Sequence, residues 1–231
     1  MSKYFDAYRI DHVLGFFRIW EIPADAVHGL LGQFAPSLGM SREEIEAYGL
    51  PFHEDHFTRP FISDGIVDRI FHEKAEDVKR LYLNHSHDDI YVMKPEFDTQ
   101  KKIEAVFAAE RQQLEAMNSD KKVLADHDSL RDGLYSLVSN VLFLRDRKDS
   151  NKFHPRISAQ QDFTYEALYD CDKAVFNRLY DDYFYHRNNQ FWYREAMKKL
   201  PKLVQATRML VCAEDLGMVP QCVQPVLERL R

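Results

Sequence analysis

Two short apolar runs lie near opposite ends of the chain. The first covers residues 8–17 and mixes Ile, Val, Leu and Phe with a few polar residues, and the second covers residues 209–213. Short apolar runs bounded by polar or turn-forming residues are typical of buried strands. We therefore predict a buried strand over residues 8–13 and another over residues 209–213.

The residues between these runs show apolar positions three and four apart, which is typical of helices. Ser41-Arg42-Glu43-Glu44 has the pattern of a capping box and predicts a helix over residues 42–48. Pro201 is expected to end a helix over residues 191–200. Further helices are predicted over 66–83 with a break near residue 73, and over 99–117, 129–142, 165–169, 173–186 and, after Pro220, 221–230. Short extended segments are predicted over 90–93 and 141–144, and loops over 51–60 and 151–161.

Composition and charge exclude several classes of protein. The net charge of −6 argues against non-specific binding to nucleic acid, which requires concentrated positive charge. No apolar run has the length of a membrane span, and residues 1–6 do not resemble a signal peptide. These features predict no membrane partner and a cytoplasmic protein.

The three cysteines, Cys171, Cys212 and Cys222, have no spacing typical of a disulfide framework or a zinc site. Cys212 lies in the second apolar run, so we predict a buried free thiol there. Five histidines are concentrated in the first half of the chain, but their spacing fits no standard metal site, and we predict neither a metal nor another cofactor. They are His53, His56, His72, His85 and His87.

Two carboxylates follow the predicted strands and are the strongest candidates for chemistry. Asp11 lies in the first apolar run, Glu214 comes directly after the second, and a glycine follows each within a few residues. Retaining glycosyl-transfer enzymes use two facing carboxyl groups, one as nucleophile and one as acid/base. Two structural alternatives exist: Asp11 pairs only with Arg9, which lies on the same strand face, or Glu214 only begins a helix.

Several other residues have both a binding and a structural interpretation. Trp20 and Trp192 have rings large enough to stack on sugars, but such rings also fill protein cores, and Trp192 is the better candidate for packing. His154-Pro155-Arg156 either reaches a sugar or forms a structural loop.

Residues 8–12, Tyr-Arg-Ile-Asp-His, together with residues 212–217, Cys-Ala-Glu-Asp-Leu-Gly, resemble the 4-alpha-glucanotransferases. These are the amylomaltases and disproportionating enzymes of glycoside hydrolase family 77. Segments 16–23, 152–157 and 183–187 resemble the subgroup with a large insertion, which includes plant cytosolic and Bacteroidetes members. The resemblance covers essentially the whole chain.

The resemblance implies a (β/α)8 barrel with active-site residues at the C-terminal ends of its strands. It implies that Asp11 is the nucleophile after the fourth strand and Glu214 the acid/base after the fifth. Arg9 is then the arginine that keeps the nucleophile ionised and helps to bind substrate, and His12 contacts the substrate. The implied partners are alpha-1,4-glucans and maltooligosaccharides, with self-association as a further expectation.

About 200 positions separate Asp11 from Glu214, whereas one βαβ unit needs only about 30 residues. We therefore expect a mainly α chain, in which a helical insertion over residues 25–206 is flanked by two parallel strands of an incomplete (β/α)8 barrel. The barrel parts are predicted over residues 1–24 and 207–231.

The family also has a third acid, in a His-Asp pair after a later strand, and no residue after Glu214 matches it. We expect the chain to be an internal part of a longer retaining 4-alpha-glucanotransferase and to be inactive alone. The alternative is a non-catalytic helical module for glucan contact or subunit association.

Overall fold

The computed structural model describes residues 4–230, which are mainly α-helical, as the sequence predicted. The chain forms two compact units. The first unit comprises the described residues up to 21, residues 34–40 and the described residues from 174 onward. The second unit comprises residues 22–33 and 41–173.

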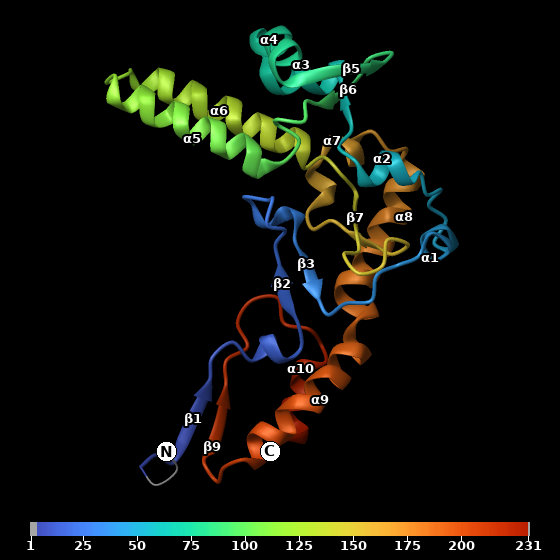
Figure 1. The fold of residues 1–231 in the computed structure, drawn as a ribbon. Coiled ribbons are helices and arrows are strands. Elements are labelled where there is room, and N and C mark those ends of the chain that lie inside the picture. Colours follow the sequence, from blue (N-terminus) through green and yellow to red (C-terminus); the bar gives the residue numbers. More distant parts are fainter. Residues whose placement is uncertain (1–3, 231) are drawn as a thin grey trace. The chain divides into compact units, whose positions relative to one another are not determined.

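The first unit contains a parallel strand pair and the helices that pack beside it (Figure 1). Strands β1 (Ala7–Ile10) and β9 (Leu210–Ala213) pair in parallel, as the resemblance predicted, with Ala7 opposite Leu210 and Ile10 opposite Ala213. The other strands are β2 (Ile19–Glu21) and β3 (Gln33–Ala35), which pair with each other; β3 belongs to this unit from Phe34 onward. Its helical segments are η1 (Val13–Phe16), η5 (Asp182–Arg187), α9 (Asn189–Gln205), α10 (Val223–Arg229) and the end of α8 (Asp170–Asp181).

The core of the first unit lies where η1, α9 and α10 meet. Val13 and Phe17, which follow β1, are fully buried there. They pack in one cluster with Trp192 and Leu200 of α9 and Val226 of α10. This apolar contact anchors the turn after β1 to both helices, and so positions the residues within that turn.

The second unit contains most of the helices, together with small antiparallel sheets. Helix α1 (Arg42–Ala47) begins at the predicted capping box: the Ser41 hydroxyl accepts from the amide of Glu44, whose carboxylate accepts from the amide of Ser41. The other helical segments are η2 (Gly29–Leu31), α2 (Glu54–Thr58), α3 (Asp64–Phe71), η3 (His72–Lys74), α4 (Ala75–Tyr82), α5 (Gln100–Ala116), α6 (Lys121–Val138), η4 (Ala159–Gln161), α7 (Phe163–Glu166) and the start of α8. The strands are β4 (Ile62–Ser63), β5 (Leu83–His87), β6 (Ile90–Met93), β7 (Phe143–Arg145) and β8 (Phe153–Pro155).

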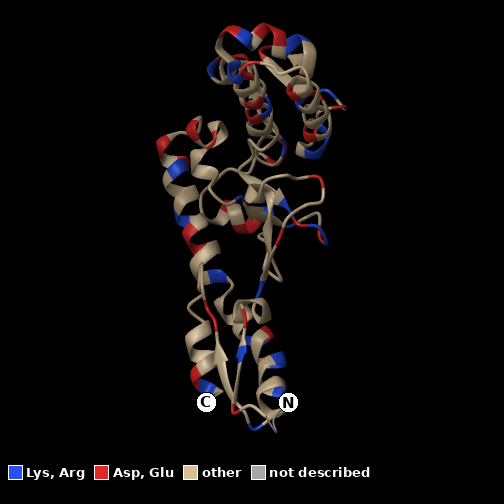
Figure 2. Cartoon of the chain, turned by 90° about the vertical axis from the view of Figure 1, so that its left-hand side faces the viewer, with Lys and Arg blue, Asp and Glu red and all other residues tan. Residues whose placement is uncertain are grey.

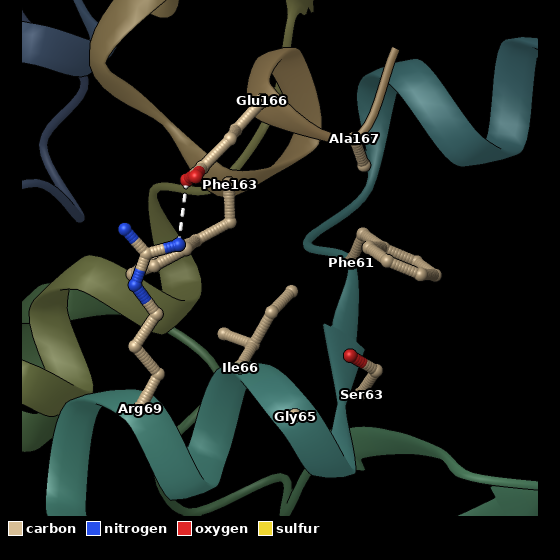
Figure 3. Close-up of a pocket in the computed structure, with 8 residues that line it drawn as sticks. All are labelled: Phe61, Ser63, Gly65, Ile66, Arg69, Phe163, Glu166 and Ala167. Carbon is tan, nitrogen blue, oxygen red and sulfur yellow. Dashed lines mark hydrogen bonds and ion pairs between the residues drawn. The ribbon is translucent and has the colours of Figure 1, made fainter. Parts of the chain in front are cut away.

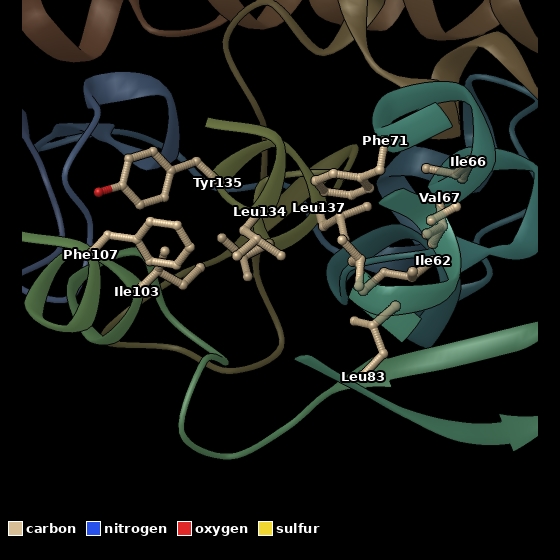
Figure 4. Close-up of a cluster of buried hydrophobic side chains, with 13 residues drawn as sticks. Ile62, Ile66, Val67, Phe71, Leu83, Ile103, Phe107, Leu134, Tyr135 and Leu137 are labelled. Atoms are coloured by element: carbon tan, nitrogen blue, oxygen red, sulfur yellow. The ribbon is translucent and has the colours of Figure 1, made fainter. Parts of the chain in front are cut away.

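Helices α3, α5 and α6 enclose the core of the second unit (Figure 4). Ile103 and Phe107 of α5 face Leu134 and Leu137 of α6, and Phe71 of α3 completes the cluster. Acidic and basic residues are interleaved along the helices of this unit (Figure 2). On α5 and α6 several of these charges form partly exposed ion pairs within one helix, each of which contributes little to stability.

The structure corrects several sequence-based expectations of secondary structure. The first strand ends at Ile10 rather than residue 13, because the chain turns at residues 11–12 and then forms η1. It is also not buried: the residues of β1 are exposed or half-buried, since among residues 4–230 β1 pairs only with β9. Helix α2 and strand β8 lie in segments predicted as loops, and β5 begins at the last residue of a predicted helix and continues where no element was predicted.

Pro201 does not end its helix, since α9 continues to Gln205. Proline removes one helix hydrogen bond and crowds the preceding turn. Burial of Trp192, Ala196 and Leu200 on one face of α9 offsets that penalty. Cys212 is exposed rather than buried, whereas Cys222 is the buried thiol, and all three cysteines are free. None of the helices in the described part of the chain is long and apolar enough to cross a membrane.

Candidate active site

The register of the strand pair brings Asp11 and Glu214 to the same place. Ile10 and Ala213 are the last paired residues, so Asp11 and Glu214 come next on their two strands. The amide of Glu214 donates to the carbonyl of Ile10 over 3.1 Å, and the amide of Val13 donates to the carbonyl of Glu214 over 2.8 Å. Residues about 200 positions apart are thereby held together at the C-terminal ends of two parallel strands.

Arg9 contacts both carboxylates from the same strand face as Asp11. One guanidinium nitrogen, Nη2, lies 2.8 Å from Oδ1 of Asp11 and 3.4 Å from Oε2 of Glu214. Residues two apart on a strand point to the same side, which explains this arrangement. The Asp11 side chain is 78% exposed, whereas that of Glu214 is 26% exposed.

The pKa of the Asp11 carboxyl is held below its usual value by two neighbours. The larger cause is a side-chain hydrogen bond with Glu214, and the second is the hydrogen bond from Arg9. Both neighbours favour the ionised form of the Asp11 carboxyl.

His12 forms the turn directly after Asp11 and has a left-handed backbone, with φ of 52° and ψ of 62°. Such a conformation is uncommon for residues other than glycine and is often found near functional sites. The carbonyl of His12 accepts from the amide of Gly15 over 3.0 Å, and its side chain is exposed. The turn thus presents the imidazole to solvent next to the two carboxylates.

Arg18 is a buried residue near this site that the sequence analysis did not identify. It is 4% exposed, and its guanidinium lies 3.6 Å from the ring centre of Phe34 and 4.4 Å from that of Trp192. It donates a hydrogen bond to the carbonyl of Met218, four residues after Glu214. Burial lowers the pKa of Arg18 to about 10. A single arginine within the otherwise apolar segment 16–20 was the available signal.

Most of the other candidates from the sequence have structural positions. Trp192 is buried in the core of the first unit and donates to the carbonyl of Pro36, so it offers no face to a sugar. His154 and Arg156 are both buried in the second unit, which contradicts a role in reaching over a cleft. Trp20 is half-buried and packs edge-on against Phe34, with ring centres 4.7 Å apart. No group of three or more His, Cys, Asp or Glu residues within residues 4–230 could hold a metal ion.

Comparison with known proteins identifies the family. The family model described as 4-alpha-glucanotransferase matches residues 1–231, and the chain therefore belongs to that family. One curated relative is the 4-alpha-glucanotransferase DPE2 of Oryza sativa subsp. japonica, which is 39% identical over 232 residues. The match covers 100% of this chain but 24% of the rice protein, so the chain spans about a quarter of that relative's length. No solved structure gave a significant match.

Proposed function

We propose that Asp11 and Glu214 are the nucleophile and the acid/base of a retaining 4-alpha-glucanotransferase larger than these 231 residues. The main observation behind the proposal is that Ile10 and Ala213 form the last residue pair of β1 and β9, and Asp11 and Glu214 directly follow these two residues on neighbouring strands. The proposed substrates are alpha-1,4-glucans and maltooligosaccharides, which the family description supports. The resemblance to plant cytosolic members also favours a cytoplasmic enzyme.

The proposed reaction has two displacements. In the first, a carboxylate oxygen of Asp11 bonds to the anomeric carbon of the donor while the glycosidic C–O bond breaks, and Glu214 gives its proton to the departing oxygen. In the second, Glu214 takes the proton from a hydroxyl of the acceptor sugar, whose oxygen displaces Asp11. The two inversions together retain the α configuration and restore both carboxyl groups.

The contacts of Arg9 and the position of His12 support a role for each in this scheme. Arg9 stabilises the ionised form of Asp11, and His12 lies in position to contact substrate at the same turn. Retaining enzymes hold their two carboxyl groups about 5–5.5 Å apart. Nη2 of Arg9 lies 2.8 Å from Asp11 and 3.4 Å from Glu214, so a sugar that enters between the two carboxylates has to move these side chains apart.

The proposal places the strand pair in the (β/α)8 barrel of the complete enzyme, within residues 1–24 and 207–231, and treats residues 25–206 as the helical insertion. An apolar hollow of about 440 Å³ in the first unit supports it. The hollow is lined by Ile10, Val13, Val211 and Leu227, among others. In a barrel, further secondary-structure elements cover such a face. The same hollow also favours the alternative role in subunit association, which sedimentation of the chain at several concentrations would reveal.

Trapping the covalent intermediate tests the proposed roles directly. In the complete enzyme, Glu214→Gln with α-maltosyl fluoride should accumulate a maltosyl group, since fluoride leaves without an acid but the acceptor lacks its base. Mass spectrometry of peptides should locate this group on Asp11, and Asp11→Asn should prevent it. A maltosyl group on another carboxylate would contradict the assignment. The 231-residue chain alone should not disproportionate maltotriose, because no residue after Glu214 matches the family's third acid.

A further inference from the structure

A small hollow in the second unit combines aromatic and charged side chains (Figure 3). Its volume is about 240 Å³. Two half-buried phenylalanine rings line it, Phe61 from the segment before β4 and Phe163 from α7. We call it the aromatic hollow. Its other lining residues include Gly65, Arg69 and Glu166.

One buried side chain fixes the two segments that carry these rings. Asn140 is 1% exposed, and its Nδ2 donates to the carbonyl of Phe61 over 2.7 Å. Its Oδ1 accepts from the amide of Thr164, next to Phe163, over 2.9 Å. A buried amide satisfied on both sides holds its partners rigidly. The backbone of both ring-bearing segments is therefore fixed before any ligand arrives, and both rings also pack against the core of the second unit, which reduces the entropy lost on binding.

A charged pair lies beside the rings. Arg69 of α3 donates to Glu166 of α7 over 2.7 Å, and its guanidinium lies 5.2 Å from the ring centre of Phe163. Figure 3 shows Phe61 on the opposite side of the hollow from Arg69. Both members of the pair are more than half exposed, so the pair contributes little to stability. Guanidinium and carboxylate together provide several directed donors and acceptors in a small space.

This combination suits one ring of a sugar chain. One face of a glucose unit consists of C–H groups, which pack on aromatic rings. The hydroxyls around its edge form hydrogen bonds with guanidinium and carboxylate groups. Concave sites of this kind bind through apolar walls and a few placed polar groups. We propose that the aromatic hollow binds a glucose unit of an alpha-1,4-glucan, as a second glucan site in addition to the carboxylate pair. The ligand class rests on the proposed function.

Gly65 allows a sharp test, because a Cβ added there meets no atom within 4 Å. In the complete enzyme, Gly65→Trp should fill the hollow, and Gly65→Ala is its matched control. Arg69→Gln removes the charge beside Phe163, and Arg80→Gln removes a comparable exposed arginine that pairs with Asp77 on α4. The probes are glycogen, in affinity electrophoresis, and maltotriose, in a disproportionation assay.

We expect Gly65→Trp and Arg69→Gln to weaken retardation by glycogen about fivefold or more, the effect of losing one or two good contacts. Both controls should leave retardation unchanged, and kcat/KM for maltotriose should be unchanged in all four variants. Unchanged retardation in Gly65→Trp and Arg69→Gln would overturn the proposal, and a change in the sedimentation of these two variants alone would then assign the hollow to subunit association. A loss of maltotriose turnover in parallel with retardation would also overturn the proposal. Absence of maltotriose turnover in the unmodified enzyme would instead refute the proposed function, while retardation would still decide the second site.

Discussion

The backbone amide of Val13 donates to the carbonyl of Glu214 over 2.8 Å and extends the contact between β1 and β9 beyond their last paired residues. Val13 is itself fully buried against α9 and α10. The hydrogen bond therefore ties Glu214 to the best-packed part of the first unit. A residue on an irregular segment after a short strand gains a fixed position in this way, which a catalytic group requires.

The first prediction concerns the two carboxylates in the complete enzyme. Asp11→Asn and Glu214→Gln should each lower kcat for maltotriose by several orders of magnitude, because one removes the proposed nucleophile and the other the proposed proton donor. Both substitutions keep the size of the side chain and its hydrogen-bonding capacity, so the thermal unfolding midpoint should change little. Near-normal kcat in either variant, with wild-type contamination excluded, would remove that residue from the mechanism.

The second prediction concerns pH. The pKa of Asp11 is lowered by Glu214 and then by Arg9, so Asp11 stays ionised below the pH at which an ordinary aspartate takes up a proton. Any contribution of the ionised Asp11 to the free energy of unfolding is fully present at pH values above the pKa that Asp11 has in the unfolded chain. This contribution is lost as the pH falls through the lower pKa that Asp11 has in the folded chain. Arg9→Met removes the second cause and should raise the pKa, which moves the acid limb of the kcat/KM profile to higher pH.

The contact with Glu214 remains in Arg9→Met, so the pKa of Asp11 should stay partly lowered. Arg59→Met is a suitable control, because it removes an equally exposed arginine from an ion pair with Asp55 in the second unit. An acid limb that does not move in Arg9→Met would show that Arg9 has no influence on the ionisation of the nucleophile.

The sequence predicted local features well where the signal and its partner are close together. The capping box at Ser41 and Glu44 formed as expected, and the helical pattern over residues 66–83 broke near residue 73 as predicted. The proximity of Asp11 and Glu214 was predicted only through the resemblance, since nothing local in either motif specifies a neighbour about 200 positions away.

The features that the sequence did not predict depend on distant contacts. Helix α2 is five residues long and is held by Phe57, which is buried against Phe52 and Phe143. Strand β5 depends on pairing with β6, because its own residues after Leu83 are polar and exposed. In each case tertiary packing outweighs weak local preference.

The third prediction concerns Arg18 as a positioning residue. Its hydrogen bond to the carbonyl of Met218 restrains the segment after Glu214, and its guanidinium lies between Phe34 and Trp192. Arg18→Met keeps the apolar volume but removes the donor. Because misplacement of a catalytic group by about 1 Å lowers rate about 100-fold, we expect kcat to fall between about tenfold and 100-fold with KM nearly unchanged.

Stability should respond differently from activity in Arg18→Met. Burial disfavours the charge of Arg18, as its lowered pKa shows, and replacing a buried charge by an apolar side chain is often neutral. We therefore expect a change of at most about 1 kcal/mol in the free energy of unfolding. Arg18→Lys should retain part of kcat by keeping a donor. A large loss of stability with normal kcat per folded molecule would show that Arg18 serves packing alone.

The fourth prediction compares two helical glycines of the second unit. A Cβ at Gly133 of α6 would lie 2.5 Å from Cε1 of Phe71 and 2.9 Å from Cγ2 of Ile70, whereas a Cβ at Gly65 of α3 meets nothing within 4 Å. Alanine is favoured over glycine in a helix by about 1 kcal/mol. At Gly65 that preference acts alone, so Gly65→Ala should raise the free energy of unfolding by up to about 1 kcal/mol.

At Gly133 the added methyl group has to displace Phe71, which is buried in the core of the second unit. Overpacking of a close-packed core is destabilising by about 1–3 kcal/mol. This cost exceeds the gain of about 1 kcal/mol from replacing glycine by alanine in a helix. Gly133→Ala should therefore lower the free energy of unfolding by about 1–2 kcal/mol and the midpoint by several degrees. Chemical and thermal unfolding of the two variants decides the matter. If Gly133→Ala is stabilised as much as Gly65→Ala, then Phe71 moves freely and the contact between α3 and α6 is looser than described.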